Sequence, residues 1–256
     1  MSKKYHIKKD GTPGICRAKP DNCPYGDSSK HFSTLEKAQI YADKLNEIQK
    51  INNKKLNIFL NSLKEKGAKT FYVGGFVRDE ILGKENKDID IEIHNITEKD
   101  FIEISKNQNI QLDYVGKSFG VFKANLEGED FDFSFPRTEK QIGDKHTDFE
   151  ITVDPFIGTD KAAERRDFTI NALMKNTDTG EILDYYGGLD DLKNKVIKHC
   201  SDKFSEDALR VFRAAQFSSR FNFKIAPETI ELSRNIDCSN LPKERIFEET
   251  NKAILK

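Results

Sequence analysis

The stretch GGFVRDEILGKENKDIDIEI, residues 74–93, decides how this chain is expected to fold. Two adjacent glycines lead into a short amphipathic segment that predicts a turn and a helix, and an apolar strand follows. Because side chains alternate faces along a strand, Asp88, Asp90 and Glu92 share one face, and the isoleucines on the other face are expected to be buried. Three like charges on one face repel each other, so this pattern requires an explanation.

A second acidic strand is expected over residues 130–135. It places Asp130, Asp132 and Ser134 on one face and three phenylalanines on the other. If the two strands are neighbours on one core, their carboxylates converge on one polar surface. Such a cluster suits hard divalent cations such as Mg²⁺, and a pair of these ions can activate an attacking hydroxyl and stabilise a leaving pyrophosphate. The alternative is a half-exposed strand whose acidic residues face solvent.

The glycines favour the metal interpretation. Gly74 and Gly75 precede a predicted helix, so their backbone N–H groups can approach a phosphate closely, at a helix N-terminus whose dipole favours anions. A phosphate-binding turn beside metal-binding carboxylates is what nucleotidyl transfer requires.

The composition is that of a soluble globular protein, with 256 residues, 36% hydrophobic and 33% charged. No run approaches the roughly 20 apolar residues of a membrane span, and the first residues lack the apolar section of a secretory signal, so a cytoplasmic location is expected. The four cysteines are too few and too scattered for a disulfide framework. Cys16 and Cys23, with His6 and His31 nearby, leave open a zinc cluster as the alternative to an irregular loop with incidental cysteines.

Charge is distributed unevenly along the chain. Residues 1–69 hold 15 Lys and Arg against 7 Asp and Glu, whereas the remainder holds 27 against 36. A basic arm on an acidic body is compatible with a polyanionic partner such as RNA. A merely solvated lysine-rich face is the other interpretation.

The periodicity suggests an accessory element, a mixed α+β domain and a helical domain. Residues 1–33 look irregular, and residues 33–66 predict one long helix or two consecutive ones. Helical residues 101–105 interrupt a series of short strands, and the chain is mainly helical from residue 182 onward. The strands are expected at residues 70–73, 88–93, 111–115, 120–125 and 130–135. We therefore expect a basic N-terminal extension over 1–50, a catalytic domain over 51–180 and a helical domain over 181–256.

Six ordered motifs give the strongest indication. The motifs are GGFVRDEILG…KDIDIEI, FDFSFPRTEK, ERRDFTINAL, YYGGLDDL, FSEDALRVFRAAQFSSRF and LPKERIFEET. Together, over about residues 67–255, they resemble the motifs of class II (bacterial-type) tRNA nucleotidyltransferases and bacterial poly(A) polymerases, in the DNA polymerase β-like superfamily. The resemblance implies an α+β head, with a small mixed sheet and flanking helices, followed by an all-α neck.

The resemblance also implies roles for residues of the head. Asp88 and Asp90 would bind two catalytic Mg²⁺ ions, and Asp132 would be a further catalytic carboxylate. Nucleotide-binding roles fall on Gly74, Gly75, Arg78, Arg165, Asp167 and Asn171. Arg78 could instead pair with Asp79 or Asp88 to stabilise the fold.

The segment ERRDFTINAL, residues 164–173, resembles the family's sugar-recognition segment. If it is helical, Asp167 and Asn171 lie on one face at i,i+4, and Phe168 and Leu173 face the core. A carboxylate and an amide so placed can hydrogen-bond a ribose 2′-OH, which favours ribonucleotides.

The segment FSEDALRVFRAAQF carries the E-D-x-x-R pattern that in the family replaces a nucleic-acid template. On a helix, Glu206 and Asp207 would lie one turn before Arg210, and Arg213 would follow one turn later. The aspartate and Arg210 would then pair with the base of CTP or ATP, while Glu206 orients Arg210. The alternative is an ordinary ion pair on a helix surface.

The remaining motifs resemble connecting parts of the family fold. Asp184 and Gly187-Gly188 match the hinge between head and neck, and residues 242–249 match a neck helix that braces the nucleotide pocket. The polar residues 137–152 correspond to a flexible loop that takes part in switching between C and A addition. Family members normally continue past the neck into domains that grip tRNA, so we expect the basic N-terminal extension to supply some of that RNA contact.

The expected function is Mg²⁺-dependent addition of C and/or A from CTP and ATP to an RNA 3′ end, most simply that of tRNA. Poly(A) or A-only addition and nucleotidyl transfer to a non-RNA acceptor are the alternatives. A non-catalytic RNA-binding relative is a third hypothesis, but loss of a metal ligand would be its signature and all three aspartates are present.

Overall fold

The computed structural model describes residues 5–7, 13–15, 36, 54–114, 120–141 and 149–255. The chain divides into two compact units, Met1–Ile58 and Phe59–Lys256. In the first, β1 (Tyr5–Ile7) and β2 (Pro13–Ile15) form an antiparallel pair in which Tyr5 lies opposite Ile15. The zinc alternative lies outside the described residues. Of the one or two helices predicted over 33–66, the structure describes residue 36 and α2 (Lys54–Glu65).

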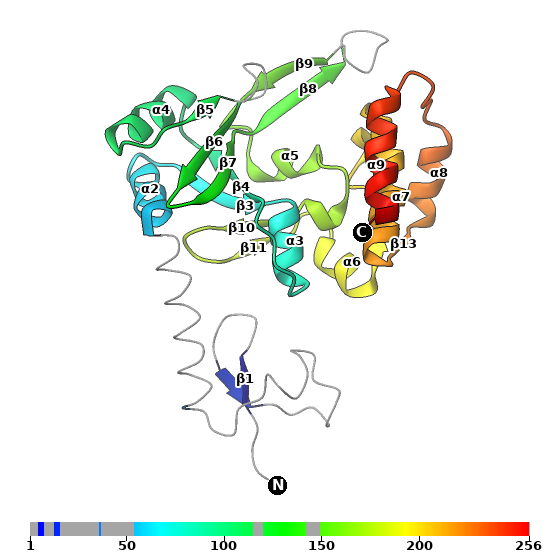
Figure 1. Cartoon of the computed structure of the whole chain (residues 1–256), viewed down its shortest axis with the longest axis horizontal. Helices are drawn as coiled ribbons and strands as arrows, with labels where there is room; N and C mark the ends of the chain where they lie inside the picture. The colour runs from blue at the N-terminus through cyan, green and yellow to red at the C-terminus, as the bar shows by residue number, and fades with distance from the viewer. Residues whose placement is uncertain are drawn as a thin grey trace. The chain divides into compact units, whose positions relative to one another are not determined.

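The second unit is built on a seven-stranded mixed sheet (Figure 1). Strands β4 and β7 run parallel, whereas the other neighbouring pairs in this sheet are antiparallel. Both central strands have the polar and apolar alternation that places one row of side chains on each face. In spatial order the strands are β11 (Ile182–Leu183), β10 (Met174–Asn176), β3 (Lys69–Val73), β4 (Ile89–His94), β7 (Glu129–Ser134), β6 (Val121–Leu126) and β5 (Asp113–Tyr114).

The predicted strands and their pairing are confirmed with small shifts of boundary. The two acidic strands are neighbours, which meets the condition on which the convergence of their carboxylates depended. The strand predicted over 111–115 is reduced to Asp113–Tyr114. The mixed sheet with flanking helices confirms the expected α+β head.

Aromatic side chains fill the core on one face of this sheet. Phe133 of β7 packs against Phe59 of α2 (Lys54–Glu65), with ring centroids 5.5 Å apart, and against Phe101 of α4 (Glu98–Asn107), at 5.6 Å. The start of α4 is fixed by a reciprocal cap, because the Thr97 hydroxyl accepts from the Asp100 N–H and the Asp100 carboxylate accepts from the Thr97 N–H. Figure 1 shows α2 and α4 together beside the sheet.

In the described part of this unit, three short helical segments lie between strands, one between β3 and β4 and two before β10. They are α3 (Gly75–Ile81), α5 (Thr159–Glu164) and the 3₁₀ turn η2 (Thr169–Asn171). The mainly helical part comprises α6 (Gly188–Asn194), the 3₁₀ turn η3 (Asp202–Glu206), α7 (Leu209–Phe221), α8 (Pro227–Arg234) and α9 (Lys243–Leu255). It also holds a parallel pair of two-residue strands, β12 (Val196–Ile197) and β13 (Lys224–Ile225).

One hydrophobic core runs through the predicted division at residue 180. Val77 of α3 and Phe168 belong to the same cluster as Phe217 and Phe221 of α7. At the predicted hinge, the Asp184 carboxylate accepts hydrogen bonds from the first N–H groups of α6. A Cβ at Gly188 would lie 2.2 Å from the Thr169 carbonyl oxygen, so only glycine permits this packing. Where the domains divide remains a prediction.

The segment predicted as a flexible loop, residues 137–152, contains an antiparallel ribbon. Strands β8 (Arg137–Gln141) and β9 (Phe149–Val153) pair with Arg137 opposite Val153, and residues 142–148 lie outside the described part. A two-stranded ribbon does not have to bury a whole face in a core, so its strands need no alternation of apolar and polar residues. Strands were predicted from that alternation, and these two were therefore missed.

Candidate active site

The candidate site begins with two aspartates on neighbouring strands. Asp90 of β4 lies directly opposite Asp132 of β7 in the parallel register. Asp88 is exposed and precedes β4, and its N–H donates to the Asn86 side-chain oxygen at 2.9 Å. The strand alternation therefore brings Asp90 and Asp132 to one face, and Asp88 lies at the edge of that face.

The two carboxylates are only partly compensated by positive charge. Burial, together with the charges of Asp132 and Asp88, raises the pKa of Asp90 from 3.8 to about 6, against the opposing influence of Arg166. Lys123 of β6 lies 3.0 Å from an Asp132 carboxylate oxygen. A raised pKa means that the ionised form is unfavourable here without a further cation.

These oxygen donors fit a hard divalent cation. Within the described residues, no three His, Cys, Asp or Glu side chains already converge in a metal-ligating arrangement. The donor set is nevertheless all carboxylate, and Asp90 carries an incompletely neutralised charge. Asp90 lies opposite Asp132, and Asp88 directly precedes the same strand, so these three carboxylates are the candidates for holding such an ion.

The glycine turn lies beside these carboxylates. Gly74, with φ of 67°, connects β3 to α3. A Cβ built at Gly74 would stand 3.2 Å from Nη1 of Arg166 and 3.8 Å from Oδ2 of Asp90. The backbone, the Arg166 guanidinium and the Asp90 carboxylate therefore meet at this turn, and a side chain there would be both crowded and strained.

Arg78 is buried within the protein, with 3% of its surface exposed. Its Nε and Nη2 donate to the two carboxylate oxygens of Asp79, each at 2.8 Å, and its Nη1 donates to Asn171 Oδ1 at 2.6 Å. The guanidinium also lies over the Phe221 ring, 4.7 Å from its centroid. This geometry favours the pairing with Asp79 that the sequence left open, so Arg78 can act on the site by holding Asn171.

Residues 164–173 do not form the single helix that the sequence left as a condition. Helix α5 ends at Glu164, and Phe168 is extended and forms a β-bridge with His199 before η2 begins. The helix is interrupted at Asp167, because its Oδ1 accepts a hydrogen bond from the Phe168 backbone N–H at 2.8 Å, which competes with helical hydrogen bonding.

The expected partnership of Asp167 and Asn171 nevertheless exists. The Asn171 amide donates to Asp167 Oδ1 at 3.0 Å, and Arg213 of α7 donates to Asp167 Oδ2 through Nε and Nη2 at 2.9 and 2.7 Å. Burial alone would raise the pKa of Asp167, but the Arg213 charge and these hydrogen bonds lower it. Phe168 and Leu173 are buried, as expected.

Sequence reasoning placed Glu92 with the exposed carboxylates, and the structure contradicts this. Glu92 is fully buried and accepts a hydrogen bond from Arg166 Nη2 at 3.2 Å, while Arg165 Nη2 lies 3.9 Å away. Its other oxygen lies 3.0 Å from His94 Nε2. Burial would raise the pKa of Glu92, but the His94 hydrogen bond and the two arginines lower it to about 2.

Sequence reasoning therefore missed two residues at this site, Arg166 and Glu92. The adjacent arginines of ERRD were one available signal, because a buried strand acid needs a cation. Nothing in the local pattern showed which of the two arginines would reach the Gly74 turn.

The E-D-x-x-R motif is not on one continuous helix. Glu206 ends η3, Asp207 is extended, and α7 begins at Leu209. The Asp207 carboxylate accepts from the Leu209 N–H at 3.0 Å, so it caps α7 instead of belonging to it. Arg245 of α9 lies 3.6 Å from the other Asp207 oxygen, which places the predicted bracing helix against this motif.

Arg210 connects the neck to the ERRD segment. It donates to the backbone oxygens of Lys203 and Arg165, each at 2.7 Å. These two bonds use two of the five N–H groups of the guanidinium. Arg210 is partly buried, and its neighbourhood includes the segment that carries Asp167.

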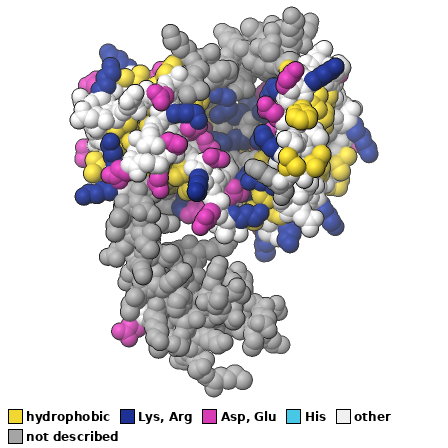
Figure 2. Space-filling view, viewed as in Figure 1, with side chains coloured by type: hydrophobic (Ala, Val, Ile, Leu, Met, Phe, Trp, Pro, Cys, Tyr) yellow, Lys and Arg dark blue, Asp and Glu magenta, His cyan; other side chains and the backbone are white. Residues whose placement is uncertain are grey.

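Basic side chains gather between the two lobes of the second unit. On the face in Figure 2, Lys and Arg side chains lie in the hollow between the sheet lobe on the left and the helical lobe on the right. Figure 1 shows α5, which directly precedes the arginines of ERRD, and α7 in the part of the molecule between the sheet and the C-terminal helices. A polyanion would be attracted to such a surface.

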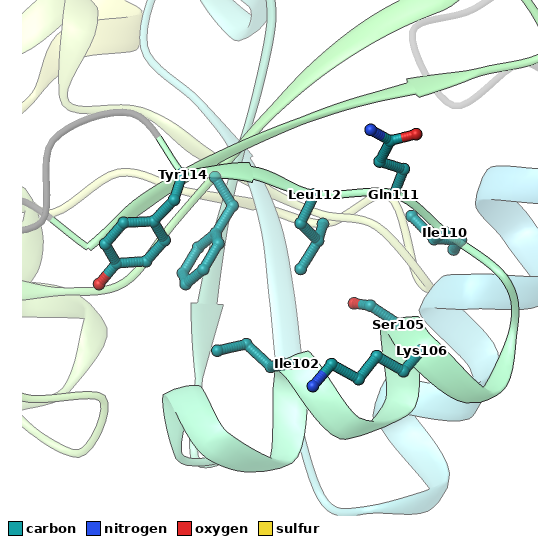
Figure 3. Close-up of a pocket in the computed structure, with 8 residues that line it drawn as sticks. Ile102, Ser105, Lys106, Ile110, Gln111, Leu112 and Tyr114 are labelled. Atoms are coloured by element: carbon teal, nitrogen blue, oxygen red, sulfur yellow. The ribbon is translucent and has the colours of Figure 1, made fainter.

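A separate cavity of about 330 Å³ lies between α4 and the sheet edge. Figure 3 shows side chains of α4 facing those that follow it, with Lys106 as the charged group. None of the predicted site residues lines this cavity, so it is not the candidate site. Its lining residues are Ile102, Ser105, Lys106, Ile110, Gln111, Leu112, Tyr114 and Phe122.

Two further expectations concern cysteines and membranes. Cys200 and Cys238 are free thiols, in agreement with the absence of a disulfide framework among the described residues. In the described part of the chain, no helix combines the length and the apolar character needed to cross a membrane.

Comparison with curated proteins gives long matches to one group. The chain matches the family model of the poly A polymerase head domain over residues 70–198. The Multifunctional CCA protein of Pasteurella multocida (strain Pm70) is 40% identical over 195 residues, covering 73% of this chain and 44% of that protein. The protein of the same name from Stenotrophomonas maltophilia (strain R551-3) is 36% identical over 194 residues, covering 73% and 46%. The chain thus spans about half the length of these relatives.

Solved structures give the same result. The Bacillus stearothermophilus CCA-adding enzyme in complex with CTP superposes with a TM-score of 0.66 at 26% identity, covering 79% of this chain and 48% of that one. A tRNA nucleotidyltransferase complexed with a primer tRNA and an incoming ATP analogue gives a TM-score of 0.60 at 31% identity, covering 75% and 54%. With its ordered motifs, its head-domain match and this fold, the chain belongs to the class II tRNA nucleotidyltransferase and poly(A) polymerase family.

Proposed function

We propose that this protein is a Mg²⁺-dependent nucleotidyltransferase that adds C and/or A residues from CTP and ATP to the 3′ end of tRNA in the cytoplasm. The observation that carries the proposal is the register of Asp90 opposite Asp132, with Gly74 and Arg166 at their side. The names of the similar proteins support the choice of CTP, ATP and tRNA.

Asp88 and Asp90 would hold two Mg²⁺ ions, with Asp132 as the further carboxylate. When bound, these ions would stabilise the negative charge that develops on the attacking and leaving oxygens. The raised pKa of Asp90 supports this assignment, because a carboxylate that is costly to ionise is stabilised by a cation.

The glycine turn and the neighbouring arginines would hold the triphosphate of the incoming CTP or ATP. Backbone N–H groups at Gly74 and Gly75 and the side chains of Arg165 and Arg166 would face the triphosphate. The RNA 3′-OH oxygen would then form a bond to the α-phosphorus and lose its proton, and the bond to the β-phosphate oxygen would break to release pyrophosphate.

Asp167 and Asn171 would recognise the ribose. Arg213 orients Asp167 through two hydrogen bonds, and Arg78 orients Asn171. Both recognition groups are therefore held rigidly, which reduces the entropy lost on binding. Without this positioning, the site would discriminate poorly between a ribonucleotide, which has a 2′-OH, and a deoxyribonucleotide, which has a 2′-H.

Asp207 and Arg210 would recognise the base edge, with Glu206 beside them. Arg210 uses two N–H groups on carbonyl oxygens and has the donor capacity to bond a base as well. Arg213 would act on the nucleotide through Asp167.

The test is labelling of tRNA transcripts that end before CCA, after C or after CC, with each NTP supplied separately. We expect CTP to label the first two and ATP to label the third, in the presence of Mg²⁺. Labelling by ATP alone, with long products, would indicate poly(A) or A-only addition. Label found only in small molecules or protein would reject an RNA acceptor, and no label with any NTP would reject catalysis.

Arg210→Ala tests the assignment of the base-recognition residue. We expect it to reduce discrimination between the cognate NTPs and GTP or UTP by about 10-fold or more, since a bidentate base contact gives about 1–3 kcal/mol of discrimination. Arg220→Ala is the matched control on the same helix, because its guanidinium lies over the Phe221 ring, 5.2 Å from the centroid. Unchanged selectivity in Arg210→Ala would remove Arg210 from this role.

A further inference from the structure

Glu92 is an unusual residue on the polar face of β4. It is fully buried, whereas Asp90, two residues earlier on the same face, is only partly buried. A buried carboxylate is destabilising unless it is paired and hydrogen-bonded. Its neighbours should therefore explain why the chain keeps an ionised group at this position.

Both oxygens of Glu92 are fixed from opposite sides. Oε1 lies 3.0 Å from Nε2 of His94, which is itself 2% exposed and packs edge-on against the Phe71 ring at 5.4 Å between centroids. Oε2 accepts from Arg166 at 3.2 Å. Because His94 cannot move without disturbing the core, Glu92 is a rigid anchor for Arg166.

Arg166 has a second carboxylate within its reach. Its Nη1 lies beside Gly74, where Asp90 Oδ2 also approaches, and its positive charge acts strongly on Asp90. Among the described residues, its hydrogen bonds and ion pairs nevertheless go to Glu92 and none goes to Asp90. Glu92 and Asp90 therefore compete for one guanidinium, and Glu92 holds it.

Arg166 remains accessible in this position. Its side chain is 17% exposed, in contrast to the complete burial of Glu92. A guanidinium that is anchored at Nη2 and lies by a glycine turn at Nη1 can meet a phosphate without first losing side-chain freedom.

Given the proposed function, we propose that Glu92, locked by His94, is a positioning residue that holds Arg166 toward the triphosphate and keeps it from pairing with Asp90. Glu92 touches neither substrate. Its effect passes through Arg166, so removing Glu92 should weaken nucleotide binding and should leave the chemical step nearly unchanged.

The experiment is a double-mutant cycle between Glu92→Gln and Arg166→Ala. We measure KM and kcat for ATP and CTP with the labelled tRNA assay, and Kd for ATP by calorimetry without RNA. Glu92→Gln should raise KM and Kd about tenfold, with kcat within about twofold, as for a charge-assisted hydrogen bond. In the Arg166→Ala background the same substitution should change KM by less than about twofold.

The outcomes separate this inference from the proposed function. If the unaltered protein labels RNA but Glu92→Gln leaves KM unchanged, the inference is overturned and the function stands. The same holds if Glu92→Gln has an equal effect with and without Arg166. If the unaltered protein neither labels RNA nor binds ATP, both are overturned.

Two further variants guard against a folding defect. Thr229→Val is the matched control, because Thr229 of α8 is fully buried and its hydroxyl accepts from the His199 backbone N–H and contacts the His199 ring, outside the proposed pocket. It should lose stability without a change in KM. If Glu92→Gln does not fold, His94 provides the test. His94→Leu should raise KM, whereas His94→Gln, which keeps a hydrogen-bond donor, should have a KM close to that of the unaltered protein. Equal KM values in the two variants would overturn the proposal.

Discussion

Asp90 and Glu92 of β4 have pKa values that are shifted in opposite directions. Asp90 and Glu92 lie two residues apart on one face of the strand, and burial alone would raise the pKa of both. The pKa of Asp90 is raised to about 6, whereas that of Glu92 is lowered to about 2. The difference lies in the neighbours, because Asp90 faces Asp132, and Glu92 faces His94 and two arginines.

This contrast separates two uses of a buried charge. The charge of Glu92 is compensated by His94 and Arg166, and it fixes the position of Arg166. The charge of Asp90 is only partly compensated by the protein, which suits a group that binds a cation. One strand thus carries a carboxylate that the protein itself compensates and one that we propose binds a cation.

The largest expected effect is the loss of activity on changing Asp90. Asp90→Asn should reduce tRNA labelling by at least about 10³-fold, because a neutral amide cannot replace a metal-binding carboxylate. Labelling of a transcript ending in CC with ATP is the measurement. Asp130→Asn is the control on β7, since the Asp130 side chain accepts from Asn125 at 2.7 Å. Retained activity in Asp90→Asn would count against the metal assignment.

Glu92→Gln should have the largest effect on stability. A carboxylate with a depressed pKa contributes stability that is present above its unfolded pKa near 4.5 and is lost as the pH falls toward 2. We expect a loss of about 3 kcal/mol at pH 7, measured by urea unfolding. The difference from the unaltered protein should shrink between pH 4.5 and 2. A difference independent of pH would show that Glu92 is not ionised in the fold.

Asp90→Asn should change stability in the opposite direction. A carboxylate with a raised pKa binds its proton more tightly in the fold, so stability falls as the pH rises from about 4 to about 6. Removing this charge should stabilise the protein by about 1–3 kcal/mol at pH 8 in EDTA, with no gain below pH 4. Added Mg²⁺ should raise the Tm of the unaltered protein and not of the variant. Equal Mg²⁺ shifts in both would contradict this role of Asp90.

The smallest effect is expected at Lys123. Its side chain is 52% exposed and lies 3.0 Å from Asp132, so Lys123→Met should change the free energy of unfolding by less than about 1 kcal/mol. Its charge lowers the pKa of Asp90, so the variant should titrate Asp90 at higher pH. Carboxyl NMR titration would measure this, and an unchanged or lower pKa would show that Lys123 does not act on the pair.

Strand periodicity predicted much of the head. The alternation placed Asp90 and Asp132 each on the polar face of its own strand, and the pairing of β4 with β7, which the sequence left as a condition, brings the two together. Helix boundaries were predicted less well. At Asp167 and Asp207 a carboxylate bonds a nearby backbone N–H, which ends or caps the helix that periodicity alone would continue.

The sequence by itself determined the family, the mixed sheet and the polar strand faces that carry Asp90 and Asp132, because these depend on local periodicity and motif order. Only the tertiary structure decided that Glu92 is buried with Arg166, that Arg78 pairs with Asp79, and that Arg213 holds Asp167. Three of the six residues in these pairs are arginines, whose long side chains can reach several carboxylates. Arg166 and Arg213 contact carboxylates on elements far apart in the chain, and Arg78 contacts its neighbour Asp79 instead of Asp88. Packing decides each of these choices, and no local pattern records it.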